Sequence, residues 1–176
     1  SAATASQPNV IVLMSEAFSD LEHIRSIKTS EPVMPFYRQL QADKNTIDGS
    51  LLVSIFGGST SSTEFEFLTG SSMYYVNDGV VPYMRWFKRP SHGLADLLNQ
   101  QGYRSVAIHP FLASYYDRDT VFPNLGFSDY VSMERFPADA RRIRGNISDA
   151  EHVAQIIRTF EQKKSGERLF LFTVSM

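Results

Sequence analysis

The stretch "NVIVLMS", residues 9–15, is a short run of apolar, mostly branched residues that follows a proline. Two further apolar runs come later in the chain, "YRSVAIH" at residues 103–109 and "RLFLFTVSM" at residues 168–176. Short continuous runs of this kind are typical of strands that are buried on both faces, as in parallel sheets. The three runs therefore predict the core of a parallel β-sheet.

Helical patterns lie between these strands. Helices are expected in "MPFYRQLQAD", residues 34–43, from Thr60 onward, and in "SHGLADLLNQQG", residues 91–102. In the last of these, Ser91 is a candidate N-cap. Another helix is expected after Ser148, which opens a capping box with the sequence "SDAE".

A further strand is expected in "TIDGSLLVSIF", Thr46 to Phe56. Strands that alternate with helices predict an α/β fold, in which a mostly parallel sheet is covered by helices on both faces. Residues 1–8 read as a polar linker or an added tail, and residues 9–176 as one domain. In open α/β sheets the ligand lies beyond the carboxyl ends of the strands. Because the last predicted strand closes the sequence, we expect the chain to be the N-terminal portion of a larger catalytic domain.

The bulk composition excludes several classes of protein. The 176 residues are 43% hydrophobic and 20% charged, which is ordinary for a globular domain with a real core. The net charge of -2 offers no broad basic field, so nucleic acid is not an expected partner. There is no cysteine, which excludes disulfides and thiolate metal sites. No apolar run approaches the roughly 18 residues that suggest a membrane-spanning helix.

Polar residues follow three of the predicted strands. Glu16 comes after the first strand, Thr60 after the strand predicted at residues 46–56, and His109 after the third. The carboxyl ends of parallel strands meet at one edge of a sheet. We therefore expect Glu16, Thr60 and His109 to project to the same edge.

Glu16 and Thr60 each allow two interpretations. Glu16 is either an acid that favours a helix N-terminus or a hard oxygen ligand for a divalent cation. Thr60 is either an N-cap or a nucleophile, and its hydroxyl needs a neighbouring base or a cation to react at neutral pH. Gly57 and Gly58 let backbone N–H groups come close to an anion at a helix start. The combination suits a phosphate ester, and the lack of a P-loop lysine disfavours nucleotide binding.

His109 and Arg118 are also open to two interpretations. His109 is either a hydrogen-bonded histidine at a strand end or a substrate ligand. Arg118 either pairs with a neighbouring aspartate in a surface loop or forms a bidentate fork for phosphate. Tyr115 and Tyr116, just before it, supply hydroxyl groups and flat faces.

Taken together, these stretches resemble the lipoteichoic acid synthase family, which are phosphoglycerol transferases of the sulfatase/alkaline phosphatase superfamily. The resemblance extends over most of the chain, in order and in spacing. It is carried by "PNVIVLMSEAF", "MPFYRQL", "GGSTSSTEFEFLTG", "GYRSVAIHPF", "YYDRDTVFPNLGF" and "LFLFTVSM".

The resemblance implies a role for each candidate residue. The acid after the first strand binds the catalytic metal, usually Mn²⁺ with Mg²⁺ as the alternative, and that position is Glu16. The nucleophilic threonine, four residues before a Glu-Phe pair, is Thr60, which also contacts the metal. His109 and Arg118 hold, orient and neutralise the phosphoglycerol group, and Tyr116 lines the pocket.

The resemblance also implies a reaction and a place. The donor is a phospholipid head group such as phosphatidylglycerol, and the acceptor is a polyol or a glycan. The domain works on the extracytoplasmic face of a bacterial membrane, with its membrane anchor outside this chain. Two alternatives stay open: a hydrolase that uses the same site with water as the acceptor, and a non-catalytic module that binds a head group.

Several positions depart from the family pattern. Ser62 stands where the family often has an acid after the nucleophile, and Phe111 stands where some members have a substrate-contacting acid. The Asp-His pair and the later histidine that complete the family's site do not occur in this chain. The Ser-x-Pro stretch at Ser30 and Pro32 has Met34 where the sulfatase motif needs arginine, and the one at Ser6 and Pro8 has Val10 there, so sulfate-ester hydrolysis is disfavoured.

Overall fold

The computed structural model describes residues 7–15, 18–24 and 26–176. Contacts along the chain divide it into two compact units. The larger unit comprises Ser1–Glu16 and Ser54–Met176, and the smaller unit comprises Ala17–Val53.

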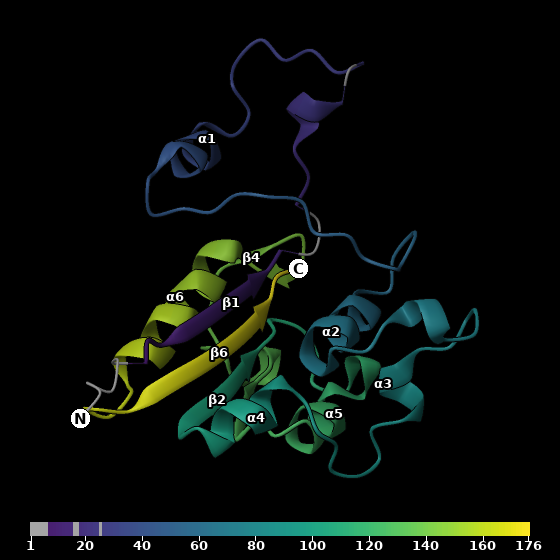
Figure 1. The fold of residues 1–176 in the computed structure, drawn as a ribbon. Helices are drawn as coiled ribbons and strands as arrows, with labels where there is room; N and C mark the ends of the chain where they lie inside the picture. Colours follow the sequence, from purple (N-terminus) through teal and green to yellow (C-terminus); the bar gives the residue numbers. More distant parts are fainter. Residues whose placement is uncertain (1–6, 16–17, 25) are drawn as a thin grey trace, which may run out of the picture. The chain divides into compact units, whose positions relative to one another are not determined.

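The larger unit is built on a four-stranded parallel sheet with the strand order β1-β6-β2-β3 (Figure 1). Its strands are β1 (Val10–Met14), β2 (Tyr103–Ile108), β3 (Asp129–Val131) and β6 (Arg168–Val174). The register pairs Met14 with Val174 and Ile108 with Thr173. The carboxyl ends of β1, β6 and β2 therefore lie at one edge, as the sequence predicted.

Helices cover both faces of this sheet (Figure 1). One face carries α2 (Thr60–Thr69), α3 (Pro82–Arg85), α4 (Leu94–Gln100) and α5 (Arg118–Asn124), and the other carries α6 (Asp149–Glu161). Alternate residues of β6 serve the two faces: Phe170 and Phe172 belong to one buried cluster, and Leu169 and Leu171 to the other. Each fully buried side chain of this size contributes roughly 1.5–3 kcal/mol. The predicted α/β architecture is confirmed.

Short elements complete the larger unit. Strands β4 (Arg142–Ile143) and β5 (Asn146–Ile147) form an antiparallel hairpin, which the sequence analysis did not predict. Its turn places Arg144 and Gly145 at φ 52° and 87°, the left-handed backbone that such two-residue turns require. Single 3₁₀ turns occur at Leu21–His23 in the smaller unit, and at Met73–Tyr75, Tyr115–Asp117 and Met133–Arg135 in the larger.

The strand predicted at residues 46–56 does not form. Ile47, Leu51 and Leu52 are exposed by 101%, 84% and 94%, and no other strand pairs with them. Strand formation requires a neighbour that supplies hydrogen bonds and buries one face, and composition alone does not provide it. Thr60 therefore reaches the sheet edge at the end of a loop, and not at the end of a strand.

The start of α4 also differs from the prediction. Its N-cap residue is Gly93, which has no side chain to cap with, and Ser91 lies outside the helix. A Cβ at Gly93 would lie 2.9 Å from the carbonyl oxygen of Leu68, near the end of α2. The glycine thus permits the close approach of α4 to α2, and packing decides the boundary here.

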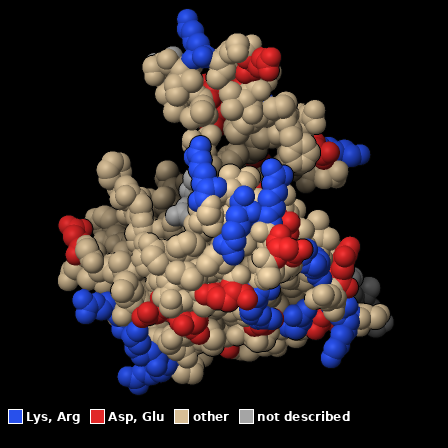
Figure 2. All heavy atoms as spheres, turned by 180° about the vertical axis from the view of Figure 1, so that it is seen from behind, with Lys and Arg blue, Asp and Glu red and all other residues tan. Residues whose placement is uncertain are grey.

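The charged side chains of the chain do not gather by sign on the face that Figure 2 shows. Lys and Arg side chains alternate there with Asp and Glu side chains. Among the described residues, no helix has the length and the apolar character needed to cross a membrane.

The smaller unit contains α1 (Pro35–Ala42), which the sequence predicted. The helix starts with proline at its first position, where the missing N–H costs nothing. None of its residues is buried, and Phe36 is 68% exposed. This unit therefore gains little from a hydrophobic core.

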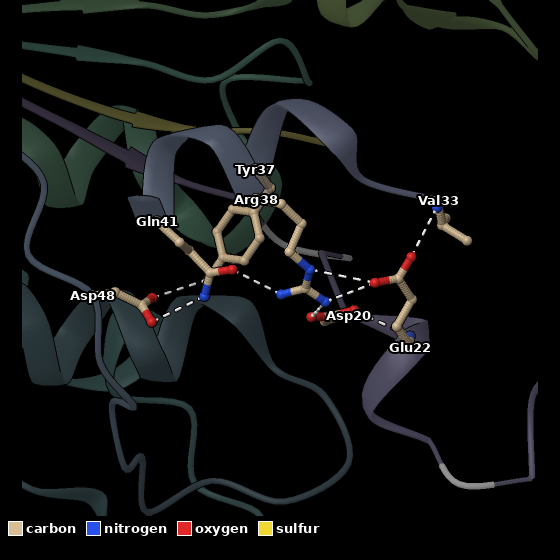
Figure 3. Close-up of polar contacts among 7 residues, drawn as sticks. All are labelled: Asp20, Glu22, Val33, Tyr37, Arg38, Gln41 and Asp48. Carbon is tan, nitrogen blue, oxygen red and sulfur yellow. Dashed lines mark hydrogen bonds and ion pairs between the residues drawn. The ribbon is translucent and has the colours of Figure 1, made fainter. Parts of the chain in front are cut away.

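Polar contacts around Arg38 hold the smaller unit together (Figure 3). The guanidinium of Arg38 binds the carboxylate of Asp20 and lies 2.9 Å from that of Glu22. It also donates to the side-chain oxygen of Gln41 at 2.8 Å, and Gln41 donates in turn to Asp48 at 2.9 Å. One arginine thus joins the segment before α1, the helix itself and the segment after it.

Candidate functional site

Thr60 is the first residue of α2 and follows three residues with left-handed backbone. Gly57, Gly58 and Ser59 have φ values of 78°, 123° and 65°. Glycine adopts such conformations readily, whereas a serine there stores strain on the order of 1 kcal/mol. The hydroxyl of Ser59 lies 2.9 Å from that of Ser62, which fixes the turn. Strained backbone of this kind often occurs at functional sites.

The start of α2 has no side-chain cap. Ser59 occupies the N-cap position, but its side chain accepts no hydrogen bond from the helix. The N-cap interpretation of Thr60 is wrong, because Thr60 lies inside the first turn. An uncapped helix start offers N–H groups and a positive dipole end to an anion.

Thr60 lines a hollow of about 250 Å³ together with Met14, Ile55, Gly58 and Thr63. Met14 is the last residue of β1, and its carbonyl accepts a hydrogen bond from the backbone N–H of Ser175. The carboxyl end of the first strand therefore opens on the same hollow as the start of α2.

The predicted metal ligand Glu16 lies outside the described residues. Within the described ranges, no group of three or more His, Asp or Glu side chains is arranged to hold a metal ion. The hollow beside Thr60 offers the hydroxyl oxygens of Thr60 and Thr63, but its described wall contains no carboxylate and no imidazole. By themselves, the described residues do not form a site for a divalent cation, which needs a shell of several oxygen or nitrogen ligands.

His109 follows β2 and is only 3% exposed. Its Nδ1 lies 3.0 Å from the backbone carbonyl oxygen of Val174, the last residue of β6. Because a carbonyl can only accept, Nδ1 carries the proton and Nε2 remains an acceptor.

Burial, helped by the charge of Arg118, lowers the pKa of His109 to about 4. His109 is therefore uncharged near neutral pH. An uncharged His109 does not neutralise a phosphate, contrary to the expectation from the sequence. Its unprotonated Nε2 can instead accept a hydrogen bond, for example from a hydroxyl group.

Arg118 is the first residue of α5 and is 1% exposed. Its Nε and Nη2 donate to the two carboxylate oxygens of Glu64, at 3.2 and 2.5 Å, and its Nη1 donates to the backbone carbonyl of Tyr115 at 3.3 Å. The surface ion pair with Asp117 or Asp119 does not form, because the guanidinium is buried against Glu64; Asp117 pairs with Lys88 instead. Arg118 is a buried arginine whose fork is already engaged by a carboxylate.

Tyr116 contacts Arg118 directly. The guanidinium carbon of Arg118 lies 5.3 Å from the centre of the Tyr116 ring, a cation–π contact. Tyr116 and Asp117 have φ values of 56° and 55°, so the chain makes a left-handed turn just before α5. The turn places the ring of Tyr116 beside the guanidinium of Arg118.

Glu64 was missed by the sequence analysis. It lies one helical turn after Thr60 in α2 and is 0% exposed. A carboxylate in an apolar helix face such as "EFEFL" must find a cation, because an unpaired buried charge is very costly. That requirement is the signal that could have identified it.

Two tyrosine hydroxyls are buried close to the Arg118–Glu64 pair. The hydroxyl groups of Tyr83 and Tyr130 have no hydrogen-bond partner among the described residues. Burial, and secondarily the Glu64 carboxylate, raises the pKa of Tyr83. Burial also raises the pKa of Tyr130. These unsatisfied groups each cost about 1–3 kcal/mol.

The predicted residues thus fall into two linked groups. Arg118 and Tyr116 are in contact, and the charge of Arg118 acts on His109. Thr60 is linked to Arg118 through Glu64, since residues four apart on a helix share one side of it. The position of Glu16 relative to these groups stays a prediction.

Comparison with protein families gives a match over nearly the whole chain. The model of the sulfatase family matches residues 8–176.

Two curated relatives come from Rhizobium meliloti (strain 1021). One, whose name assigns it to cyclic β-1,2-glucan modification, is 35% identical over 171 residues, which are 97% of this chain and 25% of the relative. The other, the capsular polysaccharide biosynthesis protein RkpI, is 30% identical over 173 residues, which are 96% of this chain and 31% of the relative.

Three solved structures share the fold. The lipoteichoic acid synthase LtaP from Listeria monocytogenes has a TM-score of 0.83 at 19% identity, covering 98% of this chain and 41% of that one. The phosphoglycerol transferase GacH from Streptococcus pyogenes, in complex with sn-glycerol-1-phosphate, has a TM-score of 0.80 at 26% identity, with coverages of 97% and 44%. A protein of the alkaline phosphatase superfamily from Vibrio parahaemolyticus has a TM-score of 0.73 at 19% identity, with coverages of 99% and 41%. The chain therefore spans less than half of each solved relative, and the predicted fold class and family resemblance are confirmed.

Proposed function

Because the chain belongs to the sulfatase family, we propose that it contributes the nucleophile to a phosphoglycerol transferase that modifies a cell-envelope glycan. One observation carries this proposal. The loop of residues 57–59 presents Thr60 at the uncapped start of α2, in a hollow that the carboxyl end of β1 also lines. A hydroxyl next to the positive end of a helix is well placed to meet an anionic phosphodiester.

The relatives support the choice of donor and acceptor. GacH is a phosphoglycerol transferase and was solved with sn-glycerol-1-phosphate. The names of both curated relatives concern polysaccharides, a cyclic β-1,2-glucan and a capsule. We infer a phosphatidylglycerol-like donor and a glycan acceptor. The reaction takes place on the extracytoplasmic side of a bacterial membrane, residues 9–176 are the N-terminal portion of the catalytic domain, and residues 1–8 are a linker.

The proposed reaction has two displacements at phosphorus. The hydroxyl oxygen of Thr60 attacks the phosphorus of the donor, its proton is released, and the bond to the diacylglycerol oxygen breaks. The leaving oxygen takes up a proton from solvent, which offsets the proton released by Thr60, so diacylglycerol leaves as an alcohol and the phosphoglycerol group stays on Thr60. An acceptor hydroxyl then attacks the same phosphorus, loses its proton and releases Thr60. The start of α2 favours the negative charge that develops on the phosphoryl oxygens.

The proposal includes a divalent cation, with Mn²⁺ as our choice. Glu16 and Thr60 are the ligands that this chain would contribute. When bound, the cation supplies positive charge against the charge that builds up on the reacting oxygens. Support comes from Met14, two residues before Glu16, because it lines the same hollow as Thr60.

The remaining residues position the substrate. The Glu64 carboxylate offsets much of the Arg118 charge, so we assign Arg118 to orientation more than to neutralisation of the phosphoglycerol group. Neutral His109 accepts a hydrogen bond from a hydroxyl of the glycerol group or of the acceptor through Nε2. We assign Tyr116 to the wall of the substrate pocket, and its contact with Arg118 supports this assignment.

The test uses the complete protein with phosphatidylglycerol, measuring diacylglycerol release with and without a polyol acceptor. Thr60→Ala should abolish release while the far-ultraviolet circular dichroism stays unchanged, and Thr60→Ser should keep part of the activity. Release at the wild-type rate in Thr60→Ala would remove Thr60 from the mechanism. Release that needs no acceptor and yields only free glycerol phosphate would favour the hydrolase.

A further inference from the structure

We propose that the groove between Tyr75 and Trp86 binds a neutral sugar ring of the acceptor glycan. The inference rests on the proposed transfer, because it gives the acceptor a place in a groove that leads toward the loop before Thr60. The groove has a volume of about 360 Å³, and its lining residues are Tyr75, Val76, Asn77, Val80, Arg85 and Trp86. This volume lies within the range of roughly 300–1,000 Å³ that is usual for small-molecule sites.

The groove continues toward the nucleophile. A second hollow, of about 310 Å³, shares Val76, Asn77 and Val80 with the groove. Its opposite wall is formed by residues 54–59, which include the glycines of the loop before Thr60. A sugar held between the aromatic rings could therefore extend its chain along the second hollow to the loop that presents Thr60.

The chemistry of the groove suits a sugar. Tyr75 and Trp86 are 85% and 50% exposed, so two large flat rings face the solvent. A pyranose has an apolar face of C–H groups, which packs against an aromatic ring. Its hydroxyl groups lie around the edge of the sugar. Asn77 and Arg85 are exposed beside the rings, and no hydrogen bond or ion pair among the described residues occupies their side chains. They can meet the hydroxyl groups at the rim, as in sites that combine apolar walls with a few polar groups.

The groove is fixed to the helix that carries Thr60. Trp86 packs edge-on against Phe65 of α2, with the ring centres 5.7 Å apart. The carboxylate of Glu66, also in α2, accepts from the backbone N–H of Met73 at 2.7 Å and of Ser54 at 3.3 Å. Helix α2 thus anchors both walls of the second hollow. These contacts fix the position of the groove relative to Thr60 at the start of the same helix.

A membrane surface is the competing occupant, since exposed Tyr and Trp side chains also gather at lipid interfaces. The observations favour the glycan. The rings line a hollow of about 360 Å³, which is large enough for a sugar ring. Asp78, in the wall of the adjoining hollow, offsets the charge of Arg85 in the groove, so the two hollows together offer no excess of positive charge to anionic head groups.

The test titrates the complete protein with neutral cyclic β-1,2-glucan in calorimetry, without donor lipid. Tyr75→Ala and Trp86→Ala should each weaken binding by tenfold or more, whereas Tyr75→Phe and Trp86→Phe should keep most of it. Phe36→Ala is the matched control, because it removes an exposed ring (68%) from the smaller unit and should bind like the wild type. Tyr75→Ala keeps the test valid even if Trp86→Ala fails to fold, because Tyr75 is almost entirely exposed.

Two outcomes would overturn the inference. The first is glucan binding that is absent in the wild type or unchanged in Tyr75→Ala. The second is a loss of binding to phosphatidylglycerol vesicles in Tyr75→Ala with glucan binding intact, which would assign the groove to the membrane. The proposed function is tested separately, since Thr60→Ala should abolish diacylglycerol release and still bind glucan.

Discussion

Arg118 and Glu64 form an ion pair whose side chains are 1% and 0% exposed. Removing two charges from water costs several kcal/mol per ion, and good geometry must offset that cost. The bidentate contact between guanidinium and carboxylate provides such geometry and joins the start of α5 to the middle of α2. The pair therefore fixes the orientation of Arg118 relative to the helix that carries Thr60.

Glu64→Gln should destabilise the fold by about 3–5 kcal/mol, because it leaves the buried guanidinium of Arg118 without a counter-charge. Urea unfolding measures the change. The double variant Glu64→Gln/Arg118→Met should recover part of the loss. Lys88→Met is the control: it removes an exposed pair (57% and 39%) and should change stability by no more than about 1 kcal/mol. Equal effects of the buried and the exposed substitution would refute this account of the pair.

Stability should fall as the pH drops from about 6.5 to about 4. Burial lowers the pKa of His109 and of His152 to about 4 in the folded chain. In the unfolded chain histidines titrate near 6.5, so between these pH values the unfolded state binds more protons and is favoured. The contribution of each histidine is complete above pH 6.5 and is lost progressively toward pH 4, up to an amount on the order of 3 kcal/mol.

Urea midpoints at several pH values test this dependence. His152→Gln removes one of the two buried imidazoles and should make the pH dependence shallower. A stability that does not change between pH 6.5 and pH 4.5 would contradict the lowered pKa values, because it would show that the two histidines bind protons as readily in the folded chain as in the unfolded chain.

Gly58→Ala should reduce both stability and activity. Gly58 has a φ of 123°, which residues with a side chain rarely adopt, and a Cβ there would meet no atom within 4 Å. The effect is therefore one of backbone strain, of about 1–3 kcal/mol, and it should displace Thr60. Gly49→Ala, also in open space but without a positive φ, should be neutral or slightly stabilising in the same unfolding assay. Indistinguishable results for the two variants would exclude strain as the cause.

Removal of divalent metal from the complete protein with a chelator should stop diacylglycerol release, and Mn²⁺ should restore it. Glu16→Ala should bind Mn²⁺ more weakly than the wild type in calorimetry, because one anionic ligand is lost. Glu22→Ala is the control, since its carboxylate is engaged by Arg38 within the smaller unit. Equal Mn²⁺ affinity in Glu16→Ala and the wild type would exclude Glu16 as a ligand.

The sequence predicted the parts of the fold whose signal is local. The apolar runs at residues 9–15, 103–109 and 168–176 became β1, β2 and β6. Strands β2 and β6 are buried as predicted, but β1 lies at the edge of the described sheet, and its Ile11 and Leu13 are 47% and 53% exposed. The run at residues 46–56 has similar composition but finds no partner strand, and pairing depends on residues far along the chain. Periodicity and composition carry no information about such a partner.

In the candidate site too, the sequence predicted local features but not contacts between residues that are far apart in the chain. The resemblance identified Arg118 and His109 by their order in the chain. It did not reveal that Arg118 is paired with a carboxylate or that His109 is uncharged. The carboxylate of Glu64 is 54 residues from Arg118, and the carbonyl of Val174 is 65 residues from His109. Whether Arg118 is free and whether His109 is charged depend on these distant contacts, which only the folded chain reveals.

The most direct test of the central claim is mass spectrometry of the complete protein after incubation with phosphatidylglycerol and Mn²⁺, without an acceptor. The account predicts a phosphoglycerol group on the peptide that contains Thr60, which disappears when an acceptor glycan is added and never forms in Thr60→Ala. Continued transfer to the glycan by Thr60→Ala would contradict the claim.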